Sequence, residues 1–307
     1  MDDYGISLSV DSLQKNYKTP DNKSLTVLKD VNLKLKHGIT AILGPNGAGK
    51  TTLIKSCTDL LDYDKGNIYY YGHDLKRMTK AEKSLTYTVL SEGNRNIYWK
   101  LTPIENIRYF AALRGINYKQ INNLSLYLLN ELNIYDKKNV LVENLSRGMQ
   151  QKTAIVCALA MNTKVVFLDE PTLGLDVESS INMSYFLIHN EALREKLILI
   201  SSHDFSFIGS TAQKILKLQE GIIVEKDEKE EINNTYIIKV KHPNEELLRH
   251  LGSEITDSNT QYCSIRVNVP YYDLGQAIQR LNNEGFNVIS AETENMNIRS
   301  FYLNKTE

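Results

Sequence analysis

Apolar and polar residues alternate along residues 6–36, which is the spacing of half-buried β-strands. The apolar run at 39–43 stops abruptly at Gly44, so it predicts a buried strand that enters a tight turn. Two further apolar runs, at 164–168 and 197–200, also have the length of buried strands. No run approaches the roughly 18 residues of a membrane span, so we expect a chain that does not itself cross a bilayer.

Helix signals follow from Thr102 onward. Thr102 suits a helix cap, Pro103 the first helical position and Glu105 the first turn, and Gly115 suits the end of the helix. A second helix is predicted at about 118–132, and a third from Gly148 to about 160. The apolar stripe of the second helix is Ile121, Leu124, Leu128 and Leu132. Because helices and strands alternate up to residue 201, the pattern predicts a parallel sheet flanked by helices.

A run of charged residues at 225–231 has the character of a solvated boundary. Beyond it, strands are predicted at 236–240, 262–269 and 286–291, with helices at 244–251 and 272–283. We therefore predict two domains, at 1–225 and 232–307. The second is a small α+β domain, for which a ferredoxin-like arrangement is the candidate.

Composition narrows the function classes. The 307 residues suit one large domain and a small one. The formal net charge is −1, with 36 Lys and Arg against 37 Asp and Glu, which argues against a dedicated nucleic-acid binder. The three cysteines are far apart and form no CxxC pair, so we interpret Cys57, Cys157 and Cys263 as buried free thiols in a reducing cytosol. The acidic N-terminus lacks the apolar core of a signal peptide.

The segment after the strand at 39–43 fits the phosphate-binding pattern GxxxxGK[ST]. Glycines let successive backbone N–H groups point at phosphate oxygens, and the helix that follows adds its positive end. Lys50 would reach the β- and γ-phosphates, and the Thr51 hydroxyl would bind Mg²⁺. The residues predicted to hold the nucleotide are Gly44, Pro45, Asn46, Gly47, Ala48, Gly49, Lys50, Thr51 and Thr52.

Two carboxylates end the strand at 164–168. The last residues of an apolar strand lie at the carboxyl edge of a parallel sheet. The loop at 44–49, here called the glycine loop, lies at the same edge. Asp169 is predicted to hold Mg²⁺, and Glu170 to polarise the attacking water. The alternative is an ordinary polar strand end, but the phosphate-binding pattern earlier in the chain favours the metal site.

The segment at 145–151, Leu-Ser-Arg-Gly-Met-Gln-Gln, resembles the LSGGQ signature of ABC ATPases. It departs from the signature at Arg147 and Met149 but keeps Ser146 and Gly148. In that family the signature faces the γ-phosphate of ATP held by the other subunit. The resemblance therefore implies that Ser146 and Gly148 contact nucleotide across a dimer.

Other segments match the same family in order. Gly174-Leu175-Asp176 is similar to its D-loop, so Asp176 is expected near nucleotide, and His203 resembles the switch histidine that contacts the γ-phosphate. Tyr17 resembles the aromatic residue that stacks on adenine. Glu92 stands where the family has a glutamine, and as a carboxylate it would bind Mg²⁺ or a bridging water.

The resemblance implies an α/β P-loop NTPase fold with a mixed β-sheet core, an antiparallel β subdomain and a helical lobe at about 93–160. It also implies an ATPase that uses ATP and Mg²⁺, with Lys50, Glu170 and His203 as catalytic residues. The expected partners are a membrane permease and a second ATP-binding subunit, with no nucleic acid. The chain would then be peripheral, on the cytoplasmic face of the membrane.

The stretch at 92–102, followed by Pro-Ile-Glu-Asn, resembles exporter ATPases for drugs, antibiotics, peptides or lipid-like substrates. We predict that it docks the permease through Tyr98 and Trp99, although both aromatics would equally suit the core of the helical lobe.

An importer ATPase has the same core motifs. An ABC ATPase of DNA repair would carry long insertions, and one acting on ribosomes would carry two nucleotide domains. A module that uses ATP only as a switch would not need Glu170.

Overall fold

The computed structural model describes residues 5–18, 21, 23–91, 97–225, 233–241, 254–258, 262–270, 278, 281 and 287–295. The chain divides into two units. The large unit contains residues 1–207 and 211–226, and the small unit contains residues 208–210 and 227–307.

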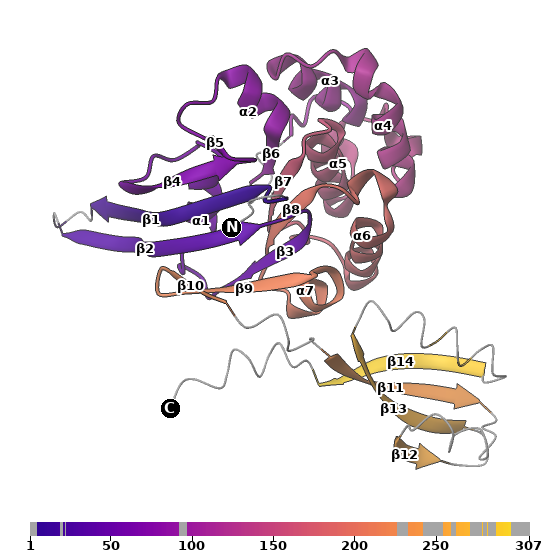
Figure 1. The fold of residues 1–307 in the computed structure, drawn as a ribbon. Helices are drawn as coiled ribbons and strands as arrows, with labels where there is room; N and C mark the ends of the chain where they lie inside the picture. Colours follow the sequence, from indigo (N-terminus) through magenta and orange to yellow (C-terminus); the bar gives the residue numbers. More distant parts are fainter. Residues whose placement is uncertain are drawn as a thin grey trace. The chain divides into compact units, whose positions relative to one another are not determined.

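The large unit begins with an antiparallel sheet of order β2-β1-β4-β5 (Figure 1). Its strands are β1 (Leu8–Lys18), β2 (Ser24–Leu35), β4 (Lys65–Tyr70) and β5 (His73–Asp74). The alternation of apolar residues at 6–36 is therefore that of two paired strands. The register of β1 shifts near Ser12, which has a left-handed φ of 49°.

The core sheet has the order β10-β9-β3-β8-β7-β6. All pairs are parallel except β10 with β9. The strands are β3 (Gly38–Leu43), β6 (Tyr87–Leu90), β7 (Val165–Asp169), β8 (Leu197–Ser201), β9 (Lys214–Gln219) and β10 (Ile222–Glu225). The fold is thus the mixed α/β arrangement that the sequence predicts.

Alternate residues of the central strands belong to two different cores. On one face Phe167 and Leu199 pack with the antiparallel sheet and with α1 (Lys50–Cys57). On the other face Leu168 and Ile200 pack with the helical lobe. Both faces of the sheet are covered, which explains why β7 and β8 are continuous apolar runs in the sequence.

The helical lobe contains α3 (Pro103–Leu113), α4 (Tyr118–Glu131) and α5 (Arg147–Ala160) (Figure 1). Thr102 and Glu105 form a reciprocal capping box at the start of α3, which is the signal read from the sequence. Three further helices are α2 (Lys80–Thr86), α6 (Val177–His189) and α7 (Phe205–Thr211). Residues 208–210 of α7 are assigned to the small unit. Among the described residues no helix is long and apolar enough to cross a membrane.

The small unit is an antiparallel sheet of order β12-β13-β11-β14. Its strands are β11 (Asn233–Lys241), β12 (Glu254–Ser258), β13 (Tyr262–Pro270) and β14 (Asn287–Asn295). Counted from the first strand, the order is 2-3-1-4, which is that of a ferredoxin-like βαββαβ unit. The sequence did not predict β12.

The predicted helix at 244–251 lies outside the described residues. Of the predicted helix at 272–283 only Ile278 and Leu281 are described, and both are helical. Leu281 is buried against Tyr236 and Ile238 of the sheet. All three cysteines are buried free thiols, as the sequence predicts, and burial raises the pKa of Cys57 to about 12.

Candidate nucleotide-binding and hydrolysis site

The glycine loop joins the end of β3 to the start of α1. Gly47 and Gly49 have left-handed φ angles of 81° and 103°, which side chains other than glycine rarely adopt. At Gly44 an added Cβ would lie 2.5 Å from the carbonyl oxygen of Leu218 on β9. The glycines of the pattern are therefore required by backbone conformation or by packing, as expected for a phosphate-binding turn.

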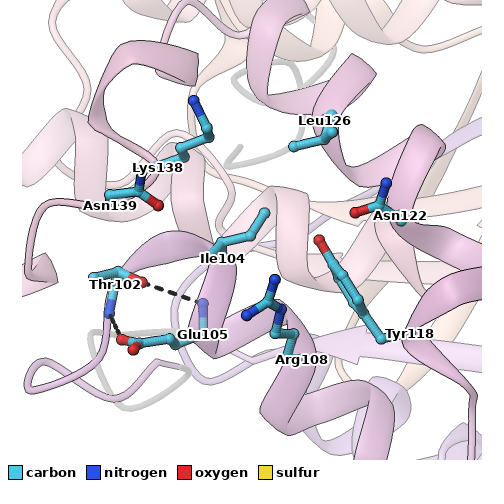
Figure 2. Close-up of a pocket in the computed structure, with 9 residues that line it drawn as sticks. All are labelled: Thr102, Ile104, Glu105, Arg108, Tyr118, Asn122, Leu126, Lys138 and Asn139. Carbon is cyan, nitrogen blue, oxygen red and sulfur yellow. Dashed lines mark hydrogen bonds between the residues drawn. The ribbon is translucent and has the colours of Figure 1, made fainter.

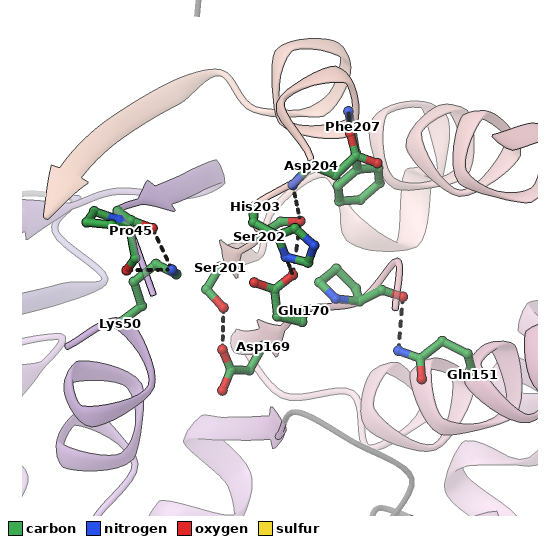
Figure 3. A network of polar contacts seen from close by, with 12 residues as sticks. Pro45, Lys50, Gln151, Asp169, Glu170, Ser201, Ser202, His203, Asp204 and Phe207 are labelled. Atoms are coloured by element: carbon green, nitrogen blue, oxygen red, sulfur yellow. Dashed lines mark hydrogen bonds and ion pairs between the residues drawn. The ribbon is translucent and has the colours of Figure 1, made fainter. Parts of the chain in front are cut away.

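Lys50 begins α1 and is almost fully buried. Its ammonium donates to the carbonyl oxygen of Gly44 at 2.6 Å and lies 3.4 Å from that of Pro45 (Figure 3). The cation is thus held across the loop that the backbone N–H groups would line. A charge of this sign at a helix start suits an anionic ligand.

Tyr17 lies beside the same helix, although it is distant in sequence. Its hydroxyl is 3.4 Å from Oγ1 of Thr52, and the residue is 38% exposed. The ammonium of Lys15 lies 5.4 Å from the centre of the ring. The exposed ring next to the phosphate loop suits the predicted stacking of a base.

Asp169 ends β7 and is 3% exposed. Its Oδ1 accepts a hydrogen bond from the Ser201 hydroxyl, whereas its buried Oδ2 has no partner among the described residues. A buried carboxylate oxygen without a donor is costly, and carboxylate oxygens are the ligands that Mg²⁺ prefers. The residues present therefore fit the predicted metal at Asp169.

Glu170 follows Asp169 and is held by two side chains. Its Oε2 lies 2.9 Å from Nδ1 of His203 and accepts from the Ser202 hydroxyl at 3.3 Å (Figure 3). The residue is 8% exposed and has a left-handed φ of 53°, a strained conformation of the kind found at functional sites. The structure thus joins two of the predicted catalytic residues directly.

The signature segment caps α5. The Ser146 hydroxyl accepts from the backbone N–H of Met149 at 3.3 Å, and Ser146 is exposed. A Cβ added at Gly148 would meet only the Leu175 side chain, at 3.6 Å. Packing among the described residues therefore does not require glycine at this position.

Asp176 caps α6, since its carboxylate accepts from the backbone N–H of Ser179 at 2.7 Å. This hydrogen bond lowers the pKa of Asp176. Nearby, the Gln151 side chain donates to the carbonyl oxygen of Pro171 at 2.9 Å. This bond links the signature helix to the turn that follows Glu170, and sequence reasoning did not anticipate it.

Glu92 lies outside the described residues. Tyr98 and Trp99 are 49% and 46% exposed, so they are not core aromatics of the helical lobe. Tyr98 packs edge-on against Tyr109, and the two hydroxyls are 3.0 Å apart.

A separate hollow of about 440 Å³ lies in the helical lobe, between α3, α4 and the segment at 138–139 (Figure 2). Arg108 lies over the Tyr118 ring there, with 4.8 Å between the guanidinium carbon and the ring centre. None of the predicted nucleotide residues lines this hollow, so it is not the site described above.

Sequence reasoning missed Ser201 and Ser202, which hold the two carboxylates. The only signal was two small polar residues between an apolar strand and His203. Together, the glycine loop, Lys50, the two carboxylates and the histidine at adjacent strand ends define the large unit as a P-loop nucleoside triphosphatase.

Comparison with known proteins narrows this class. A family profile described as "ABC transporter" matches residues 28–173. The "ABC transporter ATP-binding protein NatA" of Bacillus subtilis (strain 168) is 31% identical over 228 residues, which cover 71% of this chain and 92% of that protein. The chain therefore belongs to the ABC transporter ATP-binding proteins, and it is an ATPase.

Two further similarities are relevant. The "SkfA peptide export ATP-binding protein SkfE" of Bacillus subtilis (strain 168) is 29% identical over 219 residues, covering 71% of this chain and 87% of that protein. The dimeric post-hydrolysis structure of the ATP-binding cassette MJ0796, bound to ADP and Pi, has a TM-score of 0.62. At 22% identity, over 72% of this chain and 99% of that one, it shows a shared fold.

Proposed function

We propose that this chain hydrolyses ATP with Mg²⁺ in a two-subunit assembly and thereby powers a separate membrane permease that exports its substrate. The observation that carries the hydrolytic part is the buried Glu170 carboxylate, held by His203 at the edge of the sheet where β3 also leads into the glycine loop. A buried carboxylate in a fixed position suits the activation of a water molecule.

Each residue has a distinct part in this mechanism. Backbone N–H groups of the loop at 44–49 bind the phosphates, and Lys50 exchanges its carbonyl partners for phosphate oxygens. Asp169 would hold Mg²⁺ through Oδ2, together with the Thr51 hydroxyl, and the metal would neutralise charge on the phosphates. Glu170 orients water and takes up its proton, while His203 fixes that carboxylate.

A second subunit completes the site in this proposal. Ser146 is exposed at the start of α5, and the space around Gly148 leaves room for a ligand from outside the chain. Each ATP would lie between Lys50 of one subunit and Ser146 of the other. The dimeric MJ0796 cassette supports such an arrangement by its shared fold.

One observation supports a permease as the partner, and another supports export as the direction of transport. Exposed Tyr98 and Trp99 form an aromatic pair beside the helical lobe, of the kind that anchors protein interfaces. The similarity to SkfE, named for peptide export, favours an exporter. Copurification of a membrane protein, followed by transport into inside-out or right-side-out vesicles, tests the partner and distinguishes export from import.

Lys50→Ala tests the nucleotide site itself. Removing the ammonium from the loop is expected to weaken ATP binding at least tenfold and to abolish turnover, because the phosphates lose their nearest cation. Lys55→Ala, on the exposed side of the same helix, is the matched control. Unchanged ATP affinity and phosphate release in Lys50→Ala would contradict the proposal.

A further inference from the structure

Two consecutive serines at the end of β8 each hold a different carboxylate of the site. The Ser201 hydroxyl donates to Oδ1 of Asp169, and the Ser202 hydroxyl donates to Oε2 of Glu170 at 3.3 Å (Figure 3). Both serines are completely buried, so water does not replace either donor.

The strand order explains why Ser201 meets Asp169. Strand β8 lies between β3, which leads into the glycine loop, and β7, which delivers the carboxylates. In the parallel register Ser201 is paired with Asp169 on one side and with Ile42 on the other. Paired residues of neighbouring strands point to the same face of a sheet, so the Ser201 hydroxyl and the Asp169 carboxylate are direct neighbours.

That face is the one covered by α1. Ile42, Phe167 and Leu199 share it and pack with residues of α1. Asp169 and Ser201 continue the same alternation by one further step, toward the helix that carries Lys50 and Thr51. The bond from Ser201 occupies Oδ1 and leaves Oδ2 buried without a partner among the described residues.

Ser202 is fixed as a donor to the second carboxylate. Its oxygen accepts from the backbone N–H of Asp204 at 3.1 Å, which leaves its own proton for Glu170. Glu170 also has the His203 contact, so it keeps one partner when Ser202 is removed. The two serines therefore act on different carboxylates through different contacts.

We propose that Ser201 and Ser202 are separate positioning residues, the first for metal binding by Asp169 and the second for water activation by Glu170. This inference rests on the proposed nucleotide site. Ser201 occupies Oδ1 of Asp169, so that Oδ2 would be available to hold a cation. Ser202 holds the Glu170 carboxylate in an orientation in which it would accept a proton from water.

The test uses the full chain with Mn²⁺ as the metal probe and a non-hydrolysable ATP analogue. Electron paramagnetic resonance measures Mn²⁺ affinity, fluorescence titration in EDTA measures metal-free nucleotide affinity, and phosphate release at saturating Mg²⁺ gives kcat. Ser201→Ala is expected to weaken Mn²⁺ binding by about 10- to 100-fold and to leave metal-free nucleotide affinity unchanged. Ser202→Ala is expected to keep Mn²⁺ affinity and to lower kcat by about tenfold or more.

Two further variants guard against a purely structural effect. Ser201→Cys keeps the side-chain volume but donates weakly, so it is expected to weaken Mn²⁺ binding in the same direction. Ser125→Ala removes another completely buried hydroxyl, which donates to the Ile121 carbonyl in α4, and it is expected to change none of the three measurements.

The results separate this inference from the proposed function. If the unmodified chain binds no nucleotide, the proposed function fails. If it binds nucleotide and Mn²⁺, and Ser201→Ala and Ser201→Cys do so equally well, only the role of Ser201 is overturned. If Ser201→Ala and Ser202→Ala change all readouts alike, the separation of roles is overturned.

Discussion

At the residue scale, the two carboxylates of the site have a backbone conformation and a degree of burial that an ordinary strand end does not require. Glu170 has a left-handed φ of 53° and a nearly buried carboxylate, and Asp169 has a buried oxygen without a partner among the described residues. Both features cost stability, and neither contributes to the packing of the sheet. In the proposed mechanism these two features serve a metal ion and a water molecule.

Glu170→Gln tests the role of that carboxylate. The amide keeps the size of the side chain but is not a base, so turnover is expected to fall at least a hundredfold while ATP binding persists. Sedimentation with ATP is expected to show an accumulated nucleotide-bound dimer, because the γ-phosphate is not removed. Glu195→Gln, at an exposed carboxylate that precedes β8 and so lies at the end of the strand opposite Ser201, is the control. Normal phosphate release by Glu170→Gln would contradict the assignment.

At the element scale, side-chain hydrogen bonds link β7 and β8 of the core sheet at both ends. At the carboxyl ends, β7 and β8 are linked by the Ser201 and Asp169 side chains. At the other end, the Lys196 ammonium joins the start of β8 to the loop before β7, donating to Oδ1 of Asn162 at 3.0 Å and to the Thr163 carbonyl at 2.7 Å. Lys196 is 8% exposed, and burial lowers its pKa to about 8.

This shift predicts a pH dependence of stability. Between about pH 8 and the ordinary lysine pKa near 10.5, the unfolded chain binds more protons at Lys196 than the folded chain does. The free energy of unfolding should therefore rise with pH in this window, by about 1–3 kcal/mol relative to Lys196→Met. Urea unfolding followed by the fluorescence of Trp99, the single tryptophan, measures it for the large unit.

Lys196→Arg is the control for that measurement. A guanidinium keeps its charge throughout the window, so this variant should not gain stability relative to Lys196→Met as the pH rises. A difference between the unmodified chain and Lys196→Met that is constant from pH 7.5 to 10.5 would contradict the prediction.

At the scale of the whole molecule, the exposed aromatic residues just before α3 are the surface proposed to bind the permease. Tyr98 and Trp99 are about half exposed, and the chain holds this segment firmly. The Asn106 side chain accepts from the backbone N–H of Tyr98 at 2.7 Å and donates to its carbonyl at 3.0 Å. An ordered aromatic pair loses little conformational entropy when it binds a partner.

Trp99→Ala tests that surface. Copurification with the membrane partner is expected to decrease at least tenfold, because exposed aromatics of this kind contribute strongly to interfaces. ATP hydrolysis by the isolated chain should stay within about twofold of the unmodified protein, since hydrolysis does not use this side chain. Tyr185 is also a highly exposed aromatic residue, but it lies on α6, so Tyr185→Ala is the matched control. Equal copurification of both variants would remove Trp99 from the proposed interface.

Local signals in the sequence determined much of this protein. The glycine loop, the apolar runs that became β3, β7 and β8, and the capping signal at Thr102 all act through short-range backbone and burial requirements, so their positions follow from neighbouring residues. The resemblance to the family could also be recognised from the sequence, because its motifs are short and local. Strand β12 was missed, since a five-residue edge strand has a weak pattern of its own.

Only the tertiary structure decided which distant residues meet. The position of β8 between β3 and β7 depends on strand order, which is set by packing of the whole sheet and leaves no local mark. That order places Ser201 beside Asp169, and His203 beside Glu170. The partly exposed position of Trp99 was equally undecided, because an aromatic residue in sequence suits both a core and a surface. Its exposure depends on which helices pack against this segment in the folded chain.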